Sequence, residues 1–248
     1  MKIKEITHST QKGTREYQED RYFVAYHNCG VLLAVFDGHG GDEASTYCYG
    51  HFSQVFIEAM EEMREPTRAL KSSFGIMASV LRQYYSGTTA SLVFIPEIGD
   101  KAYTAVVGDS PIVVGRTDSS KWFGPDHNVR TNSKEAEAAQ RRGGFLSSGY
   151  IFKTMHGQGL QMARSLGDYS LTPVVSTEPE INTVGLMPGD YILVATDGLF
   201  DPGHRGLVAA SKAVTDQIEA GYTAQQLVEH AVVHAPTHDN VTAILARF

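Results

Sequence analysis

The stretch LLAVFDGHGGDEAS, residues 32–45, decides most of what the sequence says about the fold. It begins as an apolar run typical of a buried strand and ends in Asp37, His39 and three glycines. A strand ordinarily ends in a simple turn, whereas this one ends in an acid, a titratable base and a backbone with few side chains. Glycine lets a bulky ligand approach the backbone, so the stretch predicts a functional site at a strand end.

Similar apolar runs along the chain predict a sheet-rich protein. They are rich in Val, Ile and Thr and lie at 31–36, 88–95, 101–108, 111–116, 191–196 and 240–248. The segment PEIGD precedes the third of these runs and the dipeptide DS follows it. Both segments read as short turns, so we expect them to join antiparallel neighbours.

Two long helices are predicted between the early strands. Apolar residues recur every three or four positions from 43 to 64, before Pro66, and again from 70 to 84, before Ser86 and Gly87. Weaker helical patterns cover 133–142 and 223–234, and the second opens with the capping box Thr223-x-x-Gln226. Strands and helices mixed without strict alternation predict an α+β fold.

Bulk composition bounds the class of protein. No linker-like segment divides the 248 residues, so we expect one domain over 1–248. The net charge of −7 is spread along the chain without a basic cluster, which argues against a nucleic-acid partner. No apolar run could span a bilayer and no signal-peptide pattern is present, so we expect a cytoplasmic protein with no membrane partner. Without a heptad seam, a monomer is expected.

Acidic residues recur at strand ends. Asp37, Asp109 and Asp197 each follow an apolar run and Asp239 precedes the last one, while Glu19 and Asp20 form a further acidic pair. One such residue alone is ordinarily a turn residue. Several carboxylates at one edge of a sheet would repel each other, and a divalent cation is the usual compensation. Oxygen ligands favour Mg²⁺ or Mn²⁺ over zinc.

A carboxylate that bridges two metals places a metal-bound hydroxide opposite a leaving group, as phosphoryl hydrolysis requires. The reaction also needs a cation that orients the phosphate and an acid that protonates the leaving oxygen. The guanidinium of Arg15 and the imidazole of His39 are candidates for these roles. Two alternatives stay open: Arg15 as a solvated surface charge, and His39 as a turn or core residue or a metal ligand.

Other phosphatase chemistries lack their sequence patterns. No arginine-bearing loop follows Cys29 or Cys48, and no second aspartate lies two positions after Asp37. A G-x-S-x-G elbow is also missing. Metal-activated water therefore remains.

Seven blocks in order resemble the PP2C family, the metal-dependent PPM serine/threonine phosphatases. They read GTREYQEDRY, VFDGHGG, SGTTA, VVGDS, LQMARSLGD, LVATDGLFD and HDNVTAIL, and they cover the chain from about residue 13 to its end. The departures at Gln18, Pro111 and Ala163 remove none of the expected acids.

The resemblance implies a four-layer α-β-β-α sandwich, two antiparallel sheets flanked by helices, with two Mn²⁺ or Mg²⁺ ions at one edge. It implies hydrolysis of phosphoserine and phosphothreonine in phosphoprotein substrates. By position, Asp37 would bridge both metals, Asp197 and Asp239 would complete one, and Glu19 with the Gly38 carbonyl would complete the other.

The resemblance also implies the remaining roles. Asp109 with Asp197 would match a third, weaker metal site, Asp20 would hold metal-bound water, Arg15 would bind the substrate phosphate and His39 would be the general acid. Arg164 matches a family arginine of structural or functional role, and about 141–160 matches the variable flap. A pseudophosphatase binding module and a hydrolase of small phosphoesters are the alternative functions.

Overall fold

The quoted strand explains the layering of the molecule. β3 (Gly30–Phe36) is buried at every position. Leu32, Ala34 and Phe36 belong to one hydrophobic cluster, whereas the alternate residues Val31, Leu33 and Val35 belong to another. Because successive side chains of a strand point to opposite faces, β3 lies in a sheet covered on both sides.

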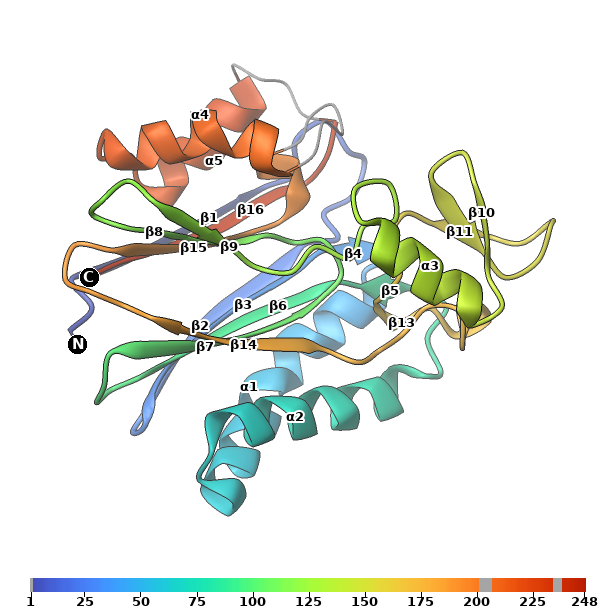
Figure 1. Cartoon of the computed structure of the whole chain (residues 1–248), viewed down its shortest axis with the longest axis horizontal. Helices are drawn as coiled ribbons and strands as arrows, with labels where there is room; N and C mark the ends of the chain where they lie inside the picture. The colour runs from blue at the N-terminus through green and yellow to red at the C-terminus, as the bar shows by residue number, and fades with distance from the viewer. Residues whose placement is uncertain (1, 201–206, 234–237) are drawn as a thin grey trace.

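The computed structural model describes residues 2–200, 207–233 and 238–248. It has two five-stranded antiparallel sheets that face each other between two pairs of helices (Figure 1). The first sheet, in spatial order, comprises β1 (Glu5–Gln11), β16 (Val241–Arg247), β15 (Tyr191–Ala195), β8 (Ile112–Gly115) and β9 (Lys121–Phe123). The second comprises β14 (Glu180–Gly185), β7 (Lys101–Val107), β6 (Ala90–Pro96), β3 and β2 (Arg21–His27). The predicted α-β-β-α sandwich is confirmed.

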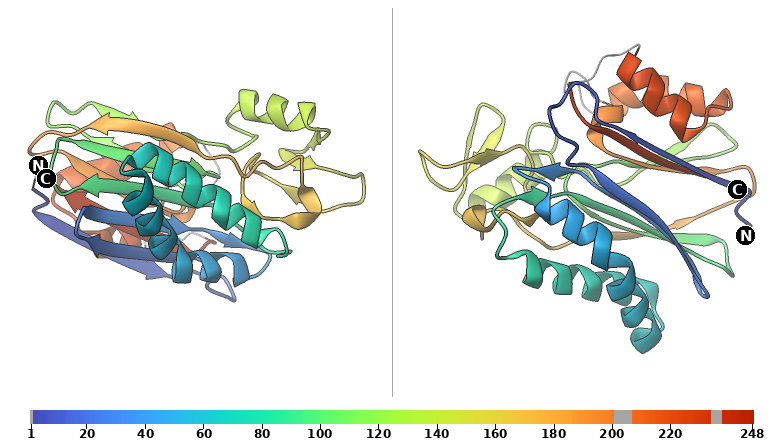
Figure 2. Two further views of the ribbon diagram at one scale, coloured as in Figure 1. Left: turned by 90° about the horizontal axis from the view of Figure 1, so that it is seen from below. Right: turned by 180° about the vertical axis from the view of Figure 1, so that it is seen from behind.

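The helices cover the outer faces of the two sheets, as Figures 1 and 2 show. α1 (Glu43–Met63) and α2 (Pro66–Leu81) pack on the second sheet, and α4 (Leu207–Glu219) and α5 (Ala224–Val233) pack on the first. The capping box is confirmed, because the Thr223 N–H donates to Gln226 Oε1 and the Gln226 N–H donates to Thr223 Oγ1. Among the described residues, no helix has the length and apolarity needed to cross a bilayer.

The bounds and number of these elements differ from the prediction. The second long helix begins at Pro66 and ends at Leu81, earlier than the pattern predicted, although Tyr84 still packs on the core. The strands β1, β2 and β14 and the helix α4 were not predicted. All three strands lie at sheet edges. β1 and β14 carry no continuous apolar run, whereas β2 contains the partly buried run YFVA, which the prediction overlooked. Position 234 of the fourth predicted helix lies outside the described residues.

The predicted hairpin at the dipeptide DS is wrong. PEIGD joins the antiparallel neighbours β6 and β7 as expected, but β7 and β8 belong to different sheets. Gly108, with φ of +102°, and Pro111, which has no N–H for a ladder, lie where the chain passes from one sheet to the other. Asp109 is thereby carried to the edge that the two sheets share.

A smaller unit lies at one end of the sandwich (Figure 1). It contains α3 (Ser133–Arg141) and a sheet of β10 (Phe145–Ser147), β11 (Tyr150–Phe152) and β12 (Gly159–Leu160), packed around a separate hydrophobic cluster. A second small sheet has the order β13 (Leu166–Gly167), β5 (Gly87–Thr88) and β4 (Gly38–His39). This second sheet includes the predicted site residues Gly38 and His39.

Candidate active site

A pocket of about 390 Å³ opens at the end of the sandwich where β3, β7 and β15 end and β16 begins. Its lining includes every predicted site residue except Asp20: Arg15, Glu19, Asp37, Gly38, His39, Asp109, Asp197 and Asp239. These residues come from five separate segments of the chain. The fold therefore brings the predicted residues together at one site.

The backbone around Asp37 is fixed by the neighbouring strand. The Asp37 N–H donates to Thr89 Oγ1 at 3.0 Å, and Thr88 Oγ1 donates to the Asp37 carbonyl at 3.1 Å. A Cβ at Gly38 would lie only 2.5 Å from the Glu19 carbonyl oxygen. Glycine at this position thus lets the Glu19 segment approach the end of β3, whereas the sequence had suggested that the glycines make room for a ligand.

The carboxylates of the pocket repel one another and raise each other's pKa. Burial, with the charges of Asp20, Asp197 and Asp239, raises the pKa of Asp37 well above its ordinary value. Burial, with Asp109 and Asp239, likewise raises the pKa of Asp197, whose side chain lies within hydrogen-bond reach of Asp37. Several ionised carboxylates so close together need a neutralising cation or bound protons.

Asp20 lies beneath this cluster and is almost fully buried. Its Oδ2 accepts hydrogen bonds from Thr196 Oγ1 at 2.9 Å and Thr242 Oγ1 at 2.7 Å, while its Oδ1 is buried without a hydrogen-bond partner among the described residues. Burial raises the pKa of Asp20 to about 7 against the effect of these two hydrogen bonds. A buried, unpaired carboxylate oxygen beside an all-oxygen donor set fits a site for a hard divalent cation such as Mg²⁺ or Mn²⁺.

Asp109 is held by residues that the sequence did not single out for the site. Asn128 Nδ2 donates to Asp109 Oδ2 at 2.8 Å, and the preceding Gly108 N–H donates to His127 Nδ1 at 3.1 Å. Burial and the charge of Asp126 raise the pKa of Asp109 to about 6. No spacing or motif in the sequence linked Asp126, His127 or Asn128 to Asp109.

Arg15 lies at the rim of the pocket with about half of its side chain exposed. Its Nε donates to the His238 carbonyl at 2.8 Å and its Nη2 donates to Asp239 Oδ2 at 2.9 Å. Burial lowers the pKa of Arg15, but Asp239, together with the charges of Asp37 and Glu19, raises that pKa overall. Arg15 is therefore a fixed cation beside the carboxylate cluster, unlike a freely solvated surface charge.

His39 has a partner that the sequence did not reveal. His39 Nε2 lies 2.8 Å from Asp168 Oδ2, although 129 positions separate the two residues in the chain. Burial lowers the pKa of His39, but the contact with Asp168, together with the charges of Asp109 and Glu19, raises it overall. Asp168 belongs to the LQMARSLGD block, in which only Arg164 had been considered.

Arg164 does not line the pocket. Its Nε and Nη2 donate to the two carboxylate oxygens of Glu135 at 3.0 and 2.5 Å, which joins α3 to the segment before β13. Of the two roles left open for this arginine, the contacts favour the structural one.

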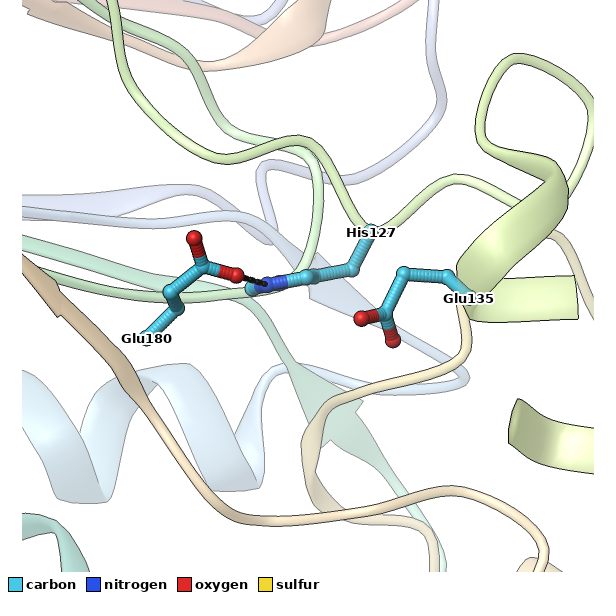
Figure 3. Close-up of side chains that lie close together, drawn as sticks. All are labelled: His127, Glu135 and Glu180. Carbon is cyan, nitrogen blue, oxygen red and sulfur yellow. Dashed lines mark ion pairs between the residues drawn. The ribbon is translucent and has the colours of Figure 1, made fainter.

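A second cluster of possible metal ligands lies outside the pocket. His127, Glu135 and Glu180 each offer an atom within 4.8 Å of the others, and Figure 3 shows Glu180 directed at the imidazole. His127 Nδ1 already accepts the Gly108 N–H, so the proton of the neutral ring lies on Nε2, 3.6 Å from Glu180 Oε2. Because Arg164 also neutralises Glu135, this cluster is an ion-pair network that joins the smaller unit to the sandwich.

The smaller unit supplies one wall of the pocket. Tyr150, Gly159, Leu160, Gln161 and Met162 line it, and Gln161 Nε2 donates to the Tyr150 hydroxyl at 2.8 Å. His238, which directly precedes Asp239 in the chain, also lines the pocket. Tyr150 and Gly159 were not predicted individually, because the variable segment at 141–160 carries no pattern that fixes single contacts. Gln161, Met162 and His238 lie in the matched blocks, but no role in the site was predicted for them.

A family model provides the deciding comparison. The model for Protein phosphatase 2C matches residues 8–240, nearly the whole chain. The chain belongs to the PP2C family. Among curated PP2C relatives, "Probable protein phosphatase 2C 11" of Arabidopsis thaliana is 29% identical over 252 residues, which cover 97% of this chain and 66% of the relative. The PP2C chain described here thus spans just under two thirds of that relative's length.

Solved structures agree on the fold of this PP2C chain. A Caenorhabditis elegans sex determining protein matches with a TM-score of 0.81 and 26% identity, over 98% of this chain and 64% of its own. The catalytic domain of the serine threonine protein phosphatase PstP, in complex with two manganese ions, matches with a TM-score of 0.63 and 22% identity, over 99% and 98% of the two chains. At these identities the similarity establishes the shared architecture, and residue roles depend on the site itself.

Proposed function

We propose that this PP2C chain hydrolyses phosphoserine and phosphothreonine in proteins with the help of divalent cations. The observation that carries the proposal is the convergence of Arg15, His39 and the carboxylates on one pocket. The curated PP2C relatives and the manganese ions reported for PstP support it. The buried, unpaired Asp20 Oδ1 and the mutual repulsion of Asp37 and Asp197 support the choice of a cation over an uncharged ligand.

Two cations, Mn²⁺ or Mg²⁺, would be held by Asp37 between them, by Asp197 and Asp239 on one side, and by Glu19 with the Gly38 carbonyl on the other. When bound, such ions lower the pKa of water and so supply a nucleophile at neutral pH. Asp109, whose charge raises the pKa of Asp197, is the proposed contributor to a third and weaker metal site. Asp20, fixed by Thr196 and Thr242, would orient water in the pocket.

Arg15 and His39 would act on the substrate. The guanidinium of Arg15, tied to Asp239 and the His238 carbonyl, is positioned to hold phosphate oxygens near the carboxylate cluster. His39 would donate a proton to the leaving oxygen, because an alkoxide of serine or threonine leaves poorly without one. We further propose that the segment at about 141–160, whose Tyr150 and Gly159 line the pocket, acts as the flap that contacts the protein substrate.

The direct test is hydrolysis of a phosphothreonine peptide by purified, chelator-stripped protein with and without Mn²⁺ or Mg²⁺. We expect turnover only with metal and no effect of thiol reagents. Metal binding by calorimetry without turnover of any phosphoester would favour the pseudophosphatase. Turnover of p-nitrophenyl phosphate without turnover of phosphopeptides would favour the hydrolase of small phosphoesters.

A further inference from the structure

We propose that Asp168 is a positioning residue for His39, which it holds through Nε2 so that Nδ1 is left to protonate the leaving group. The inference rests on the proposed function and adds a residue that the sequence did not assign. Asp168 is only 2% exposed and is not among the residues that line the pocket. It therefore acts through the imidazole and does not contact the substrate.

The small sheet of β13, β5 and β4 creates the pair. Its register places His39 opposite Gly87 on one side of β5 and Gly167 opposite Gly87 on the other. A Cβ at Gly87 would collide with both Asp168 Oδ2 and His39 Nε2. Because Gly87 has no side chain, the carboxylate of Asp168, which directly follows β13, has room to reach the imidazole of His39 in β4.

Asp168 is itself firmly held. Its backbone adopts a left-handed conformation, with φ of 49°, and its N–H donates to the Ser86 carbonyl at 3.2 Å. Ser165 Oγ donates to the same Oδ2 that meets His39. A buried carboxylate is costly unless it is paired, and among the described residues His39 is the one recorded ion-pair partner of Asp168.

The pair defines which nitrogen can act. Because Nε2–H donates to Asp168, the second nitrogen, Nδ1, is the one left for proton transfer. Nδ1 is buried and has no hydrogen-bond partner within the described part of the chain. In the reaction, water loses a proton to solvent and its oxygen bonds to phosphorus, the bond between phosphorus and the substrate oxygen breaks, and the Nδ1 proton passes to the departing oxygen. Solvent returns a proton to Nδ1 before the next turnover. The neutral imidazole keeps its Nε2–H on Asp168, as an aspartate orients a catalytic histidine in hydrolase triads.

The experiment compares alkyl and aryl leaving groups in Mn²⁺. We expect Asp168→Ala to lower kcat for a phosphothreonine peptide by about 10²-fold, within the usual range of general-acid catalysis. Turnover of p-nitrophenyl phosphate should fall only slightly, because p-nitrophenolate leaves without a proton, and KM and Mn²⁺ affinity should stay unchanged. The double variant His39→Ala/Asp168→Ala should lose no more peptide turnover than His39→Ala alone.

Two further variants guard against misfolding. Gly87→Ala keeps both partners but crowds the space between them, so it should reproduce the selective loss on the alkyl ester. Asp190→Asn is the matched control, because Asp190 is equally buried but pairs with Arg116, outside the pocket lining. This variant should lower stability and leave the ratio of alkyl-ester to aryl-ester turnover unchanged.

The outcomes separate the two proposals. If Asp168→Ala folds and loses turnover equally on the alkyl and the aryl ester, the positioning role is overturned. If Asp168→Ala does not fold, an unchanged alkyl-to-aryl ratio of turnover in both Asp168→Asn and Gly87→Ala would overturn it. An absence of metal-dependent turnover in the unmodified protein would instead overturn the proposed function, and the inference would fall with it.

Discussion

Asp37 is the residue at which stability and the proposed chemistry oppose each other. It lies at the end of a fully buried strand, and four neighbouring aspartates raise its pKa in addition to burial. Like charges held together by a rigid sheet edge are a common cost of a functional site, because the same groups must later hold a cation.

The variant Asp37→Asn tests this opposition. It removes a carboxyl group that, without a cation, must either stay ionised against its neighbours or bind a proton. In chelator at neutral pH we therefore expect the melting temperature to rise by about 2–4 °C, the shift that roughly 1 kcal/mol produces in a protein of this size. Mn²⁺ should stabilise the unmodified protein but not the variant, and peptide turnover should be lost. Thermal unfolding with and without Mn²⁺ measures both effects.

The control for this prediction is Glu62→Gln on the exposed side of α1, which should melt as the unmodified protein does in either condition. A lower melting temperature for Asp37→Asn in chelator would mean that the carboxylate is held by favourable contacts that outweigh the repulsion.

At the scale of elements, α1 shows how the sheet that carries Asp37 is kept in place. Phe52 in α1 stacks on Phe36 of β3 with ring centroids 5.9 Å apart and meets Phe74 of α2 edge to face at 5.0 Å. Phe36 immediately precedes Asp37, so the aromatic cluster supports the strand end beneath the pocket.

Truncation of this cluster should therefore be costly. We expect Phe52→Ala to lower the free energy of unfolding by about 3–5 kcal/mol, the range for a fully buried phenylalanine. Urea unfolding at a fixed Mn²⁺ concentration measures the change. Gln54→Ala, on the exposed side of the same helix, should cost less than about 0.5 kcal/mol. Comparable losses for the two variants would contradict the packing described here.

At the scale of the whole molecule, the sandwich and the smaller unit are joined through His127. The imidazole is 1% exposed and faces Glu180 of β14, Glu135 of α3 and Arg164, while its Nδ1 holds the backbone before Asp109. Burial, and next the charge of Arg164, lowers the pKa of His127 to about 4, against the opposite effects of Glu135 and the Gly108 hydrogen bond.

This shift predicts loss of stability in acid. A histidine whose pKa is about 4 when folded and 6.5 when unfolded binds its proton more readily in the unfolded chain, so stability falls as the pH drops from about 6.5 to 4. The contribution is at most roughly 3 kcal/mol. Urea unfolding at pH 7, 6 and 5 should show a flatter dependence for His127→Gln than for the unmodified protein. Parallel curves would mean that His127 is not the responsible group.

The sequence by itself determined the class of fold and nearly all of the candidate site. The strand ends at Asp37, Asp109 and Asp197 and the long helix of α1 could be predicted because periodicity and turn residues act over a few positions. The PP2C resemblance supplied the layering and the residue roles, since its seven blocks carry residue types in a fixed order.

Only the tertiary structure decided how distant segments meet. The passage of the chain from β7 to β8 between two sheets, and the pairing of His39 with Asp168, depend on which strands become neighbours. Which strands become neighbours, and in which register, depends on how much apolar surface the whole molecule buries. A local sequence pattern does not contain this information. His39 and Asp109 could therefore be predicted from the sequence, whereas their hydrogen-bond partners were known only from the tertiary structure.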